Sequence, residues 1–202
     1  MNRDNVVLTY TKEGYAGPPK EPSPEEIKKN NEQEQHSKNT DKRAKEIIGK
    51  PSPEIDVGQW IIGKPIDLSK LKGKVVVLHF WSYFWEVDNE NMEDKSTLET
   101  IRFLNALQKA FSDKDVVFVS IHGYTQRIDE LKKLVKEWNP VYNIAVDKKS
   151  PIKWSKGATF DKFGIFWGQT YVLIDSKGIV KTHTNWYDLE NRIQELISNK
   201  SQ

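Results

Sequence analysis

The chain has 202 residues, in which 31 lysine and arginine side chains nearly balance 29 aspartate and glutamate side chains, for a formal net charge of +2. This balance argues against a dedicated nucleic-acid binder, because such proteins usually carry a large basic excess. The sequence contains no cysteine, which excludes disulfides, cysteine-based metal sites, thiolate nucleophiles and dithiol redox chemistry within these residues.

No apolar run is long enough to cross a bilayer, and the N-terminus lacks the pattern of a signal peptide. We therefore expect no membrane insertion. The compartment stays undetermined, because an exported precursor trimmed before residue 1 would give the same sequence.

Residues 1–46 are predicted to form a polar N-terminal extension. Prolines cluster between Pro18 and Pro24, and the stretch from Glu25 to Lys42 has almost no apolar side chains. Such a composition buries too little surface to offset the entropy lost on ordering. Two interpretations stay open: a disordered tail, or a tether that docks on a partner and contains a polar helix over Glu25–Asn39.

Alternating strand and helix patterns follow this extension. The apolar run Val75–Trp81 predicts a central strand that is buried on both faces, and Val116–His122 predicts a second buried strand. Apolar residues spaced three and four apart predict helices over Glu90–Phe111 and Arg127–Trp138. Thr125 is the expected N-cap of the second helix.

The last part of the chain predicts a hairpin and a closing helix. Thr170–Asp175 and Ile179–Thr184 flank Ser176-Lys177-Gly178, a short turn with glycine where a positive φ is needed. Leu189–Ile197 has the spacing of an amphipathic helix. The element order therefore predicts an α/β domain over residues 47–202, with a central mixed β-sheet and helices on both of its faces.

Several segments of this domain are similar to a known family. Gly63–Trp81 contains Leu-Ser-x-Leu-x-Gly-Lys followed by a hydrophobic strand ending in Phe-Trp, and Gly49–Asp56 and Tyr171–Gly178 match the family's other segments. Over residues 47–198 the chain resembles the redoxin group of thioredoxin-like proteins, which includes AhpC/TSA-related and TlpA/ResA-like thiol–disulfide proteins. The resemblance implies a thioredoxin-like fold.

The sequence departs from this family at the active site. Members carry Cys-x-x-Cys a few residues after the Phe-Trp pair and a cis-proline just before the later strand. Here Trp85 stands in place of the first cysteine, Asp88 in place of the second and Gln169 in place of the proline. Neither an indole nor a carboxylate can form a disulfide. We therefore expect no catalytic residue of the family's kind and no cofactor.

Aromatic residues occupy both segments that a thioredoxin-like fold brings to this site. They are Tyr83, Phe84, Trp85, Phe166 and Trp167. Large rings bury much area at a low entropic cost, so they are predicted to bind a protein partner. The alternative is that they fill the volume of the former groove. Trp81, at the end of the strand, is expected in the core.

Asp88 lies at the start of a predicted helix, where its carboxylate would cap free backbone N–H groups. Two catalytic alternatives are an acid–base pair with Glu86 or Glu90, and a metal site shared with His122. We favour the cap, because crowded acids at a helix start are expected to be solvated. The histidines lack the spacing of metal ligands, so no metal site is predicted.

Three functional hypotheses follow. The leading one is a catalytically inactive thioredoxin-like domain that serves as a protein-binding, accessory or scaffold module. The second is a component of a thiol–disulfide or antioxidant pathway that acts only through a partner. The third is an enzyme with non-thiol chemistry at the former Cys-x-x-Cys site. The sequence does not fix the oligomeric state.

Overall fold

A computed structural model of the chain describes residues 10–11, 14–15, 21–82, 95–166 and 169–199. The chain divides into two compact units, residues 1–35 and 36–202, which are described one at a time. Within the described ranges, no helix combines the length and the apolar character needed to cross a membrane.

The first unit holds a two-stranded ribbon and the start of a long helix. Strand β1 (Tyr10–Thr11) pairs antiparallel with β2 (Gly14–Tyr15), and helix α1 (Pro24–Ile47) begins in this unit. A capping box explains where the helix starts: the amide of Glu26 donates to Ser23 Oγ at 3.3 Å, and the amide of Ser23 donates to Glu26 Oε2 at 2.7 Å. The polar helix considered over Glu25–Asn39 is thus present, and it is longer than expected.

The second unit includes the end of α1, where Thr40 and Ile47 are buried. Its other elements, in chain order, are β3 (Val57–Ile62), the 3-10 helix η1 (Leu68–Leu71), β4 (Val75–Trp81), α2 (Lys95–Ala110), β5 (Val116–His122), α3 (Ile128–Trp138), β6 (Asn143–Asp147), α4 (Ala158–Phe163), β7 (Thr170–Ile174), β8 (Val180–Thr184) and α5 (Leu189–Ser198).

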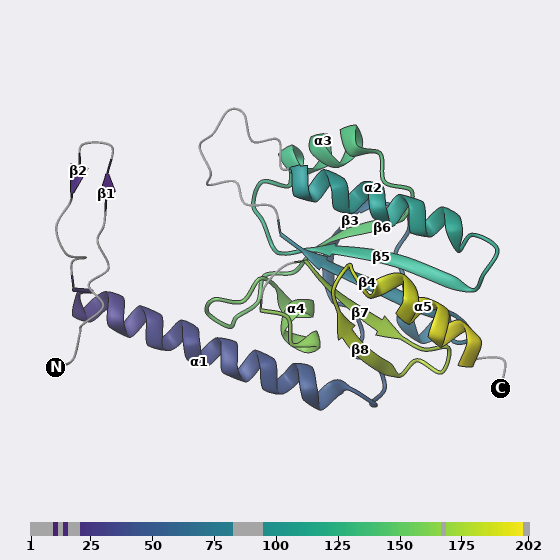
Figure 1. The fold of residues 1–202 in the computed structure, drawn as a ribbon, viewed down its shortest axis with the longest axis horizontal. Helices are drawn as coiled ribbons and strands as arrows, with labels where there is room; N and C mark the ends of the chain where they lie inside the picture. Colours follow the sequence, from purple (N-terminus) through teal and green to yellow (C-terminus); the bar gives the residue numbers. More distant parts are fainter. Residues whose placement is uncertain (1–9, 12–13, 16–20, 83–94, 167–168, 200–202) are drawn as a thin grey trace. The chain divides into compact units, whose positions relative to one another are not determined.

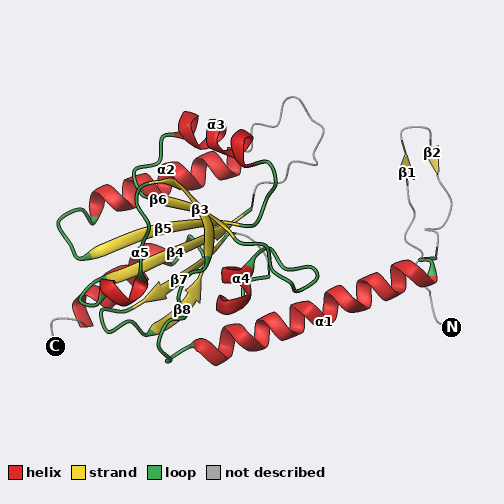
Figure 2. Ribbon diagram, turned by 180° about the vertical axis from the view of Figure 1, so that it is seen from behind, coloured by secondary structure: helices red, strands yellow, loops and turns green. Residues whose placement is uncertain are grey.

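These strands form one mixed sheet of six strands in the order β3-β6-β5-β4-β7-β8. The central strands β4, β5 and β6 are parallel, and β3, β7 and β8 pair antiparallel with their neighbours. Helices cover both faces of the sheet (Figures 1 and 2). The α/β prediction, the mixed sheet and the hairpin of β7 and β8 are confirmed.

Strand β4 is buried along its whole length, as its apolar run predicts. Because successive side chains point to opposite faces, β4 contributes to both halves of the core. Val75, Val77 and Trp81 pack with residues of α2, α3 and α5. The alternate residues Val76, Leu78 and Phe80 pack with α4 and the end of α1. Trp81 is 1% exposed, which confirms it as a core residue.

Helix α3 starts one residue later than the sequence predicts. Helix α3 begins at Ile128 with Arg127 as its N-cap, so the prediction of Thr125 as the cap is wrong. The hydroxyl of Thr125 instead accepts the amide of Arg127 at 3.0 Å, which stabilises the turn before the helix. Helix α2 is described from Lys95, and its predicted start at Glu90 lies outside the described residues.

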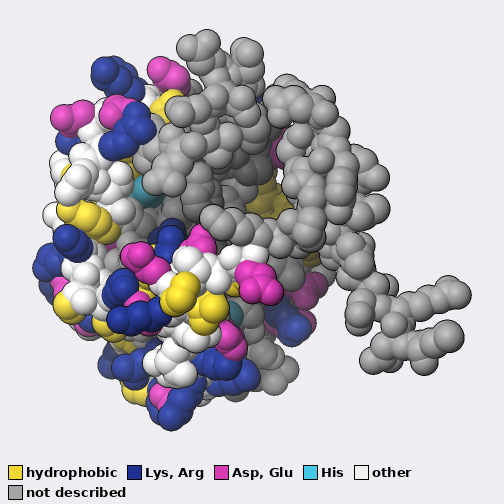
Figure 3. All heavy atoms as spheres, turned by 90° about the vertical axis from the view of Figure 1, so that its left-hand side faces the viewer, with side chains coloured by type: hydrophobic (Ala, Val, Ile, Leu, Met, Phe, Trp, Pro, Cys, Tyr) yellow, Lys and Arg dark blue, Asp and Glu magenta, His cyan; other side chains and the backbone are white. Residues whose placement is uncertain are grey.

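The surface carries both signs of charge. On the described part of the face shown in Figure 3, lysine and arginine side chains are mixed with acidic and scattered hydrophobic ones. This mixture agrees with the near balance of charge in the sequence.

Candidate functional site

The predicted site lies where β4 ends and β7 begins. The two strands are antiparallel neighbours, with Phe80 opposite Thr170 and His79 opposite Tyr171. Gln169 directly precedes β7, so its backbone lies beside the end of β4. Both β4 and β7 are interior strands of the sheet, so this junction does not lie at a sheet edge.

Much of the predicted site lies outside the described residues. This applies to Tyr83, Phe84, Trp85, Glu86, Asp88, Glu90 and Trp167. Phe166 is described, and it is only 9% exposed. Its ring packs edge-on against the His36 ring of α1, with 5.2 Å between the centroids. The structure therefore places Phe166 in the interior, against His36 of α1, and not on the exposed partner-binding surface that the sequence predicts.

Gln169 has a left-handed backbone conformation. Its φ is 64°, a region that residues other than glycine enter at a cost of about 1–2 kcal/mol. Its side-chain oxygen, Oε1, accepts a hydrogen bond from Thr100 Oγ1 of α2 at 3.3 Å. A proline ring fixes φ near about −65°. The backbone at Gln169, as described, could therefore not hold the proline that the resemblance leads one to expect there.

A buried polar cluster lies next to Gln169. His79 Nδ1 is 2.7 Å from Ser120 Oγ of β5, and its ring stacks on Tyr171 with 4.8 Å between the centroids. Burial lowers the pKa of His79 to about 3, against the opposing effect of the Gln169 side chain. The imidazole is therefore neutral near pH 7, and its role in this arrangement is to pack and hydrogen-bond within the sheet.

His122 is buried at the end of β5. Its Nδ1 donates to the carbonyl oxygen of Gly123 at 2.6 Å, and its ring meets Trp81 edge-on at 4.7 Å. Burial lowers the pKa of His122 to about 4. The proposed metal partner, Asp88, lies outside the described residues. Among the residues that are described, no group of three or more histidine, cysteine, aspartate or glutamate side chains could hold a metal ion.

A cavity of about 290 Å³ opens beside Gln169. Its lining residues come from α2, from the start of β7 and from the segment after β8. They are Glu99, Thr100, Gln169, Tyr171 and Trp186. The cavity is thus a small depression with aromatic walls, one carboxylate and two polar side chains.

Exposed aromatic rings continue from this cavity. Trp186 is 51% exposed and Tyr187 is 78% exposed. The Trp186 ring lies 4.6 Å from that of Tyr187 and packs edge-on against Phe103 of α2, with 6.1 Å between the centroids. We call Phe103, Trp186 and Tyr187 the aromatic surface. Sequence reasoning missed it, although adjacent tryptophan and tyrosine in the polar segment Asn185–Asp188 are a usable signal.

Comparisons with known proteins show what this chain is similar to in sequence and in fold. No family model matches the chain. The thiol-disulfide oxidoreductase ResA of Bacillus thuringiensis subsp. konkukian is 25% identical over 156 residues, which cover 77% of this chain and 80% of that protein. The chloroplastic peroxiredoxin Q of Sedum lineare is 26% identical over 136 residues, covering 67% of this chain and 68% of the relative.

Solved structures agree on the fold. The thioredoxin domain of a thiol-disulfide oxidoreductase from Bacteroides vulgatus aligns with a TM-score of 0.57 at 20% identity, covering 74% of this chain and 97% of that one. A thiol-disulfide isomerase from Corynebacterium glutamicum aligns with a TM-score of 0.56 at 18% identity, covering 73% and 96%. Since these identities are low, the two structures show the fold alone. Together with this fold, the two sequence relatives support a thioredoxin-like redoxin family member that is similar to thiol-disulfide oxidoreductases and peroxiredoxins.

Proposed function

We propose that this chain is a non-catalytic thioredoxin-like module that binds a protein partner. The observation that carries the proposal is the lack of cysteine in all 202 residues. Its relatives are named as a thiol-disulfide oxidoreductase and a peroxiredoxin, and thiol–disulfide exchange begins with a thiolate. These residues offer no side chain that can form a disulfide, so the fold is kept without the family's reaction.

The described side of the site supports the same proposal. Gln169 stands in the place of the family's proline, and its left-handed φ of 64° is one that a proline ring cannot adopt. The neighbouring His79 is neutral near pH 7 and is engaged with Ser120. A general acid or base works best when its pKa lies near the operating pH, and this imidazole does not meet that condition.

The aromatic surface is the part of the site that we assign to binding. Tryptophan and tyrosine are enriched among the residues that contribute most to protein–protein affinity, because they bury large areas with few rotatable bonds. Trp186 and Tyr187 expose their rings next to a cavity that could receive one partner side chain. Glu99 at its lining favours a partner residue that donates hydrogen bonds or carries positive charge.

The lack of catalysis is tested by an insulin-reduction assay with dithiothreitol. We expect the chain to add nothing to the rate of dithiothreitol alone, with a cysteine-containing thioredoxin as the positive control. Acceleration by the purified chain would overturn the proposal, because it would show that the chain catalyses disulfide reduction although it has no cysteine.

The binding role is tested by site-specific photocrosslinking in the source cells. A photoreactive p-benzoylphenylalanine in place of Tyr187 is expected to crosslink one discrete protein, and Trp186→Ala in the same background is expected to abolish that product. Val141, which is 60% exposed, serves as the matched control position. The binding role fails if no product forms at Tyr187, or if the same product forms from Val141.

A further inference from the structure

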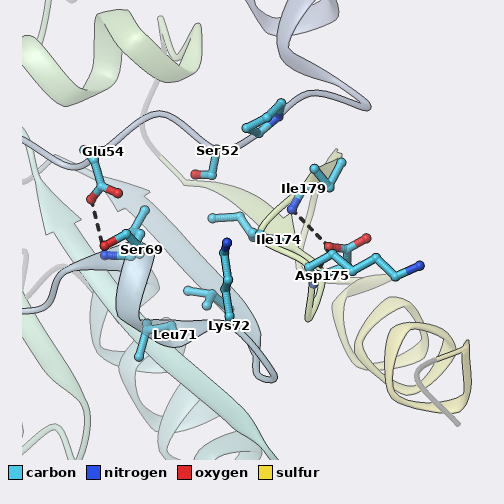
Figure 4. A pocket seen from close by; sticks show the side chains of 13 residues that line it. Ser52, Glu54, Ser69, Leu71, Lys72, Ile174, Asp175 and Ile179 are labelled. Carbon is cyan, nitrogen blue, oxygen red and sulfur yellow. Dashed lines mark hydrogen bonds between the residues drawn. The ribbon is translucent and has the colours of Figure 1, made fainter.

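A second cavity lies at the other end of the sheet, and we propose that it binds a small amphiphilic anion, namely a carboxylate on a short hydrocarbon chain. Gln169 precedes the start of β7, whereas this cavity lies where β7 ends, at Ile174. Its volume is about 290 Å³. The segment Pro51–Glu54, the 3-10 helix η1 and the turn between β7 and β8 enclose it (Figure 4). The inference is independent of the proposed partner-binding role.

The inner wall of this cavity is apolar. It is built by Leu68, Leu71, Val76, Ile174 and Ile179. Val76 and Ile174 lie opposite each other on β4 and β7, and both are 2% exposed. These side chains are fixed by the core of the domain, so the wall is formed before any ligand arrives. An apolar wall of this kind favours a hydrocarbon group, whose transfer out of water is favourable.

The acidic side chains at the rim are already engaged by the backbone. Glu54 Oε2 accepts the amide of Leu68 at 3.3 Å. Asp175 Oδ1 accepts the amides of Lys177 at 2.9 Å and Ile179 at 3.0 Å, and its Oδ2 lies 3.9 Å from the Lys181 ammonium. Both carboxylates therefore stabilise the turns that form the rim, and their charge is directed into those turns.

The lysines at and near the rim differ in whether they form an ion pair with an acidic side chain. Lys70 pairs with Asp67 at 3.1 Å, and Lys74 pairs with Asp115 at 3.6 Å. Lys72, between them in sequence, forms no ion pair with an acidic side chain of the described residues, and the same holds for Lys177. Figure 4 shows the Lys72 side chain extending from the end of η1 toward Ile174.

An apolar wall and a lysine that extends toward it together define the ligand chemistry. The hydrocarbon part would lie on the wall, and the carboxylate would accept a charge-assisted hydrogen bond from Lys72. Pockets for larger organic ligands occupy about 300–1,000 Å³, so this cavity suits a short chain. Lys177 adds a second positive charge at the opening.

Sodium octanoate is the probe for the test, added to the full-length chain and followed by ¹H–¹⁵N NMR. We expect saturable shifts at the amides of Leu71, Gly178 and Ile179, which line the cavity. Lys72→Met keeps the apolar stem and removes the charge, so it is expected to weaken the apparent affinity about fivefold. Lys70→Met removes the paired lysine of η1, two residues before Lys72, and is expected to leave the affinity unchanged.

Neutral octanol, which has the same chain, tests the role of the charge. It is expected to bind the wild-type chain more weakly than octanoate and to bind Lys72→Met as it binds the wild type. The inference is overturned if octanoate gives no saturable shift at these amides, if Lys72→Met binds it as tightly as the wild type, or if octanol binds as tightly as octanoate. Because Lys72 is exposed, matching urea midpoints of the two lysine variants will exclude a folding defect.

Discussion

Replacing Gly164 with alanine tests whether the end of α1 packs on the domain as the structure describes. Gly164 ends α4 with a φ of 65°, and a Cβ at this position would lie 2.3 Å from the backbone nitrogen of Ala44 and 2.8 Å from the carbonyl oxygen of Thr40. Both contacts are backbone atoms of a helix, which cannot move without the rest of that helix. The methyl group would therefore push the end of α1 away from α4.

Two costs add in this variant. An alanine in the left-handed region costs about 1–2 kcal/mol relative to glycine. Overpacking at a tightly packed position costs about 1–3 kcal/mol more. The free energy of unfolding of Gly164→Ala is therefore expected to fall by about 2–5 kcal/mol.

Gly178→Ala is the matched control. Gly178 has a φ of 82°, and a Cβ there would meet nothing within 4 Å, so this variant carries only the backbone cost of about 1–2 kcal/mol. Urea unfolding of both variants, followed by tryptophan fluorescence, gives the difference that belongs to the contact with α1. Equal losses in the two variants would refute the reasoning, because the close packing of residues 40–44 on α4 would then be absent in solution.

Three further predictions concern the site, each read by urea unfolding. Gln169→Gly is expected to stabilise the fold by about 1 kcal/mol, since glycine accepts the observed φ, whereas Gln169→Pro is expected to destabilise it; the reverse order would contradict the left-handed backbone. Ser120→Ala leaves His79 Nδ1 without its partner and is expected to lower the free energy of unfolding by about 1–3 kcal/mol. An unchanged free energy of unfolding would show that this hydrogen bond does not stabilise the fold. Lowering the pH from about 7 to about 5 is expected to cost about 3 kcal/mol. The pKa values of His79 and His122 in the folded chain, about 3 and about 4, lie below the ordinary 6.5, so the unfolded chain gains protons first and stability is lost as the pH falls below 6.5. Burial raises the pKa of Asp147 to about 6. Because the folded chain then binds this proton more tightly than the unfolded chain, Asp147 adds a smaller gain in stability as the pH falls. A free energy of unfolding that rises toward pH 5 would contradict the two histidine values.

Local pattern was sufficient for the elements that bury continuous apolar surface. The run Val75–Trp81 identified a strand that is buried on both faces, and Ser176-Lys177-Gly178 identified the hairpin turn. Both signals are local, because burial and turn conformation depend on residues that are adjacent in sequence. Short strands with mixed side chains, β3 and β6, and the short helix α4 gave no comparable signal and were missed.

The end of α1 could not be predicted from its own residues. The helix is polar almost throughout, and only Thr40 and Ile47 are buried in its described part. Its contact depends on Gly164, more than a hundred positions away in sequence, whose missing side chain allows the close approach. The same limit applies to Phe166, which the pattern placed on a surface and the packing of His36 places inside.

By itself, the sequence determined the α/β character of the domain, its buried central strands and the absence of cysteine from these residues, because these depend on residue types and their spacing. Only the tertiary structure decided which side chains meet. It placed His79 against Ser120 and Tyr171, set Gln169 in a conformation that a proline cannot adopt, and brought Trp186 beside α2. Strand register and the packing of distant segments produce these contacts, and neither is encoded by the period of a single segment.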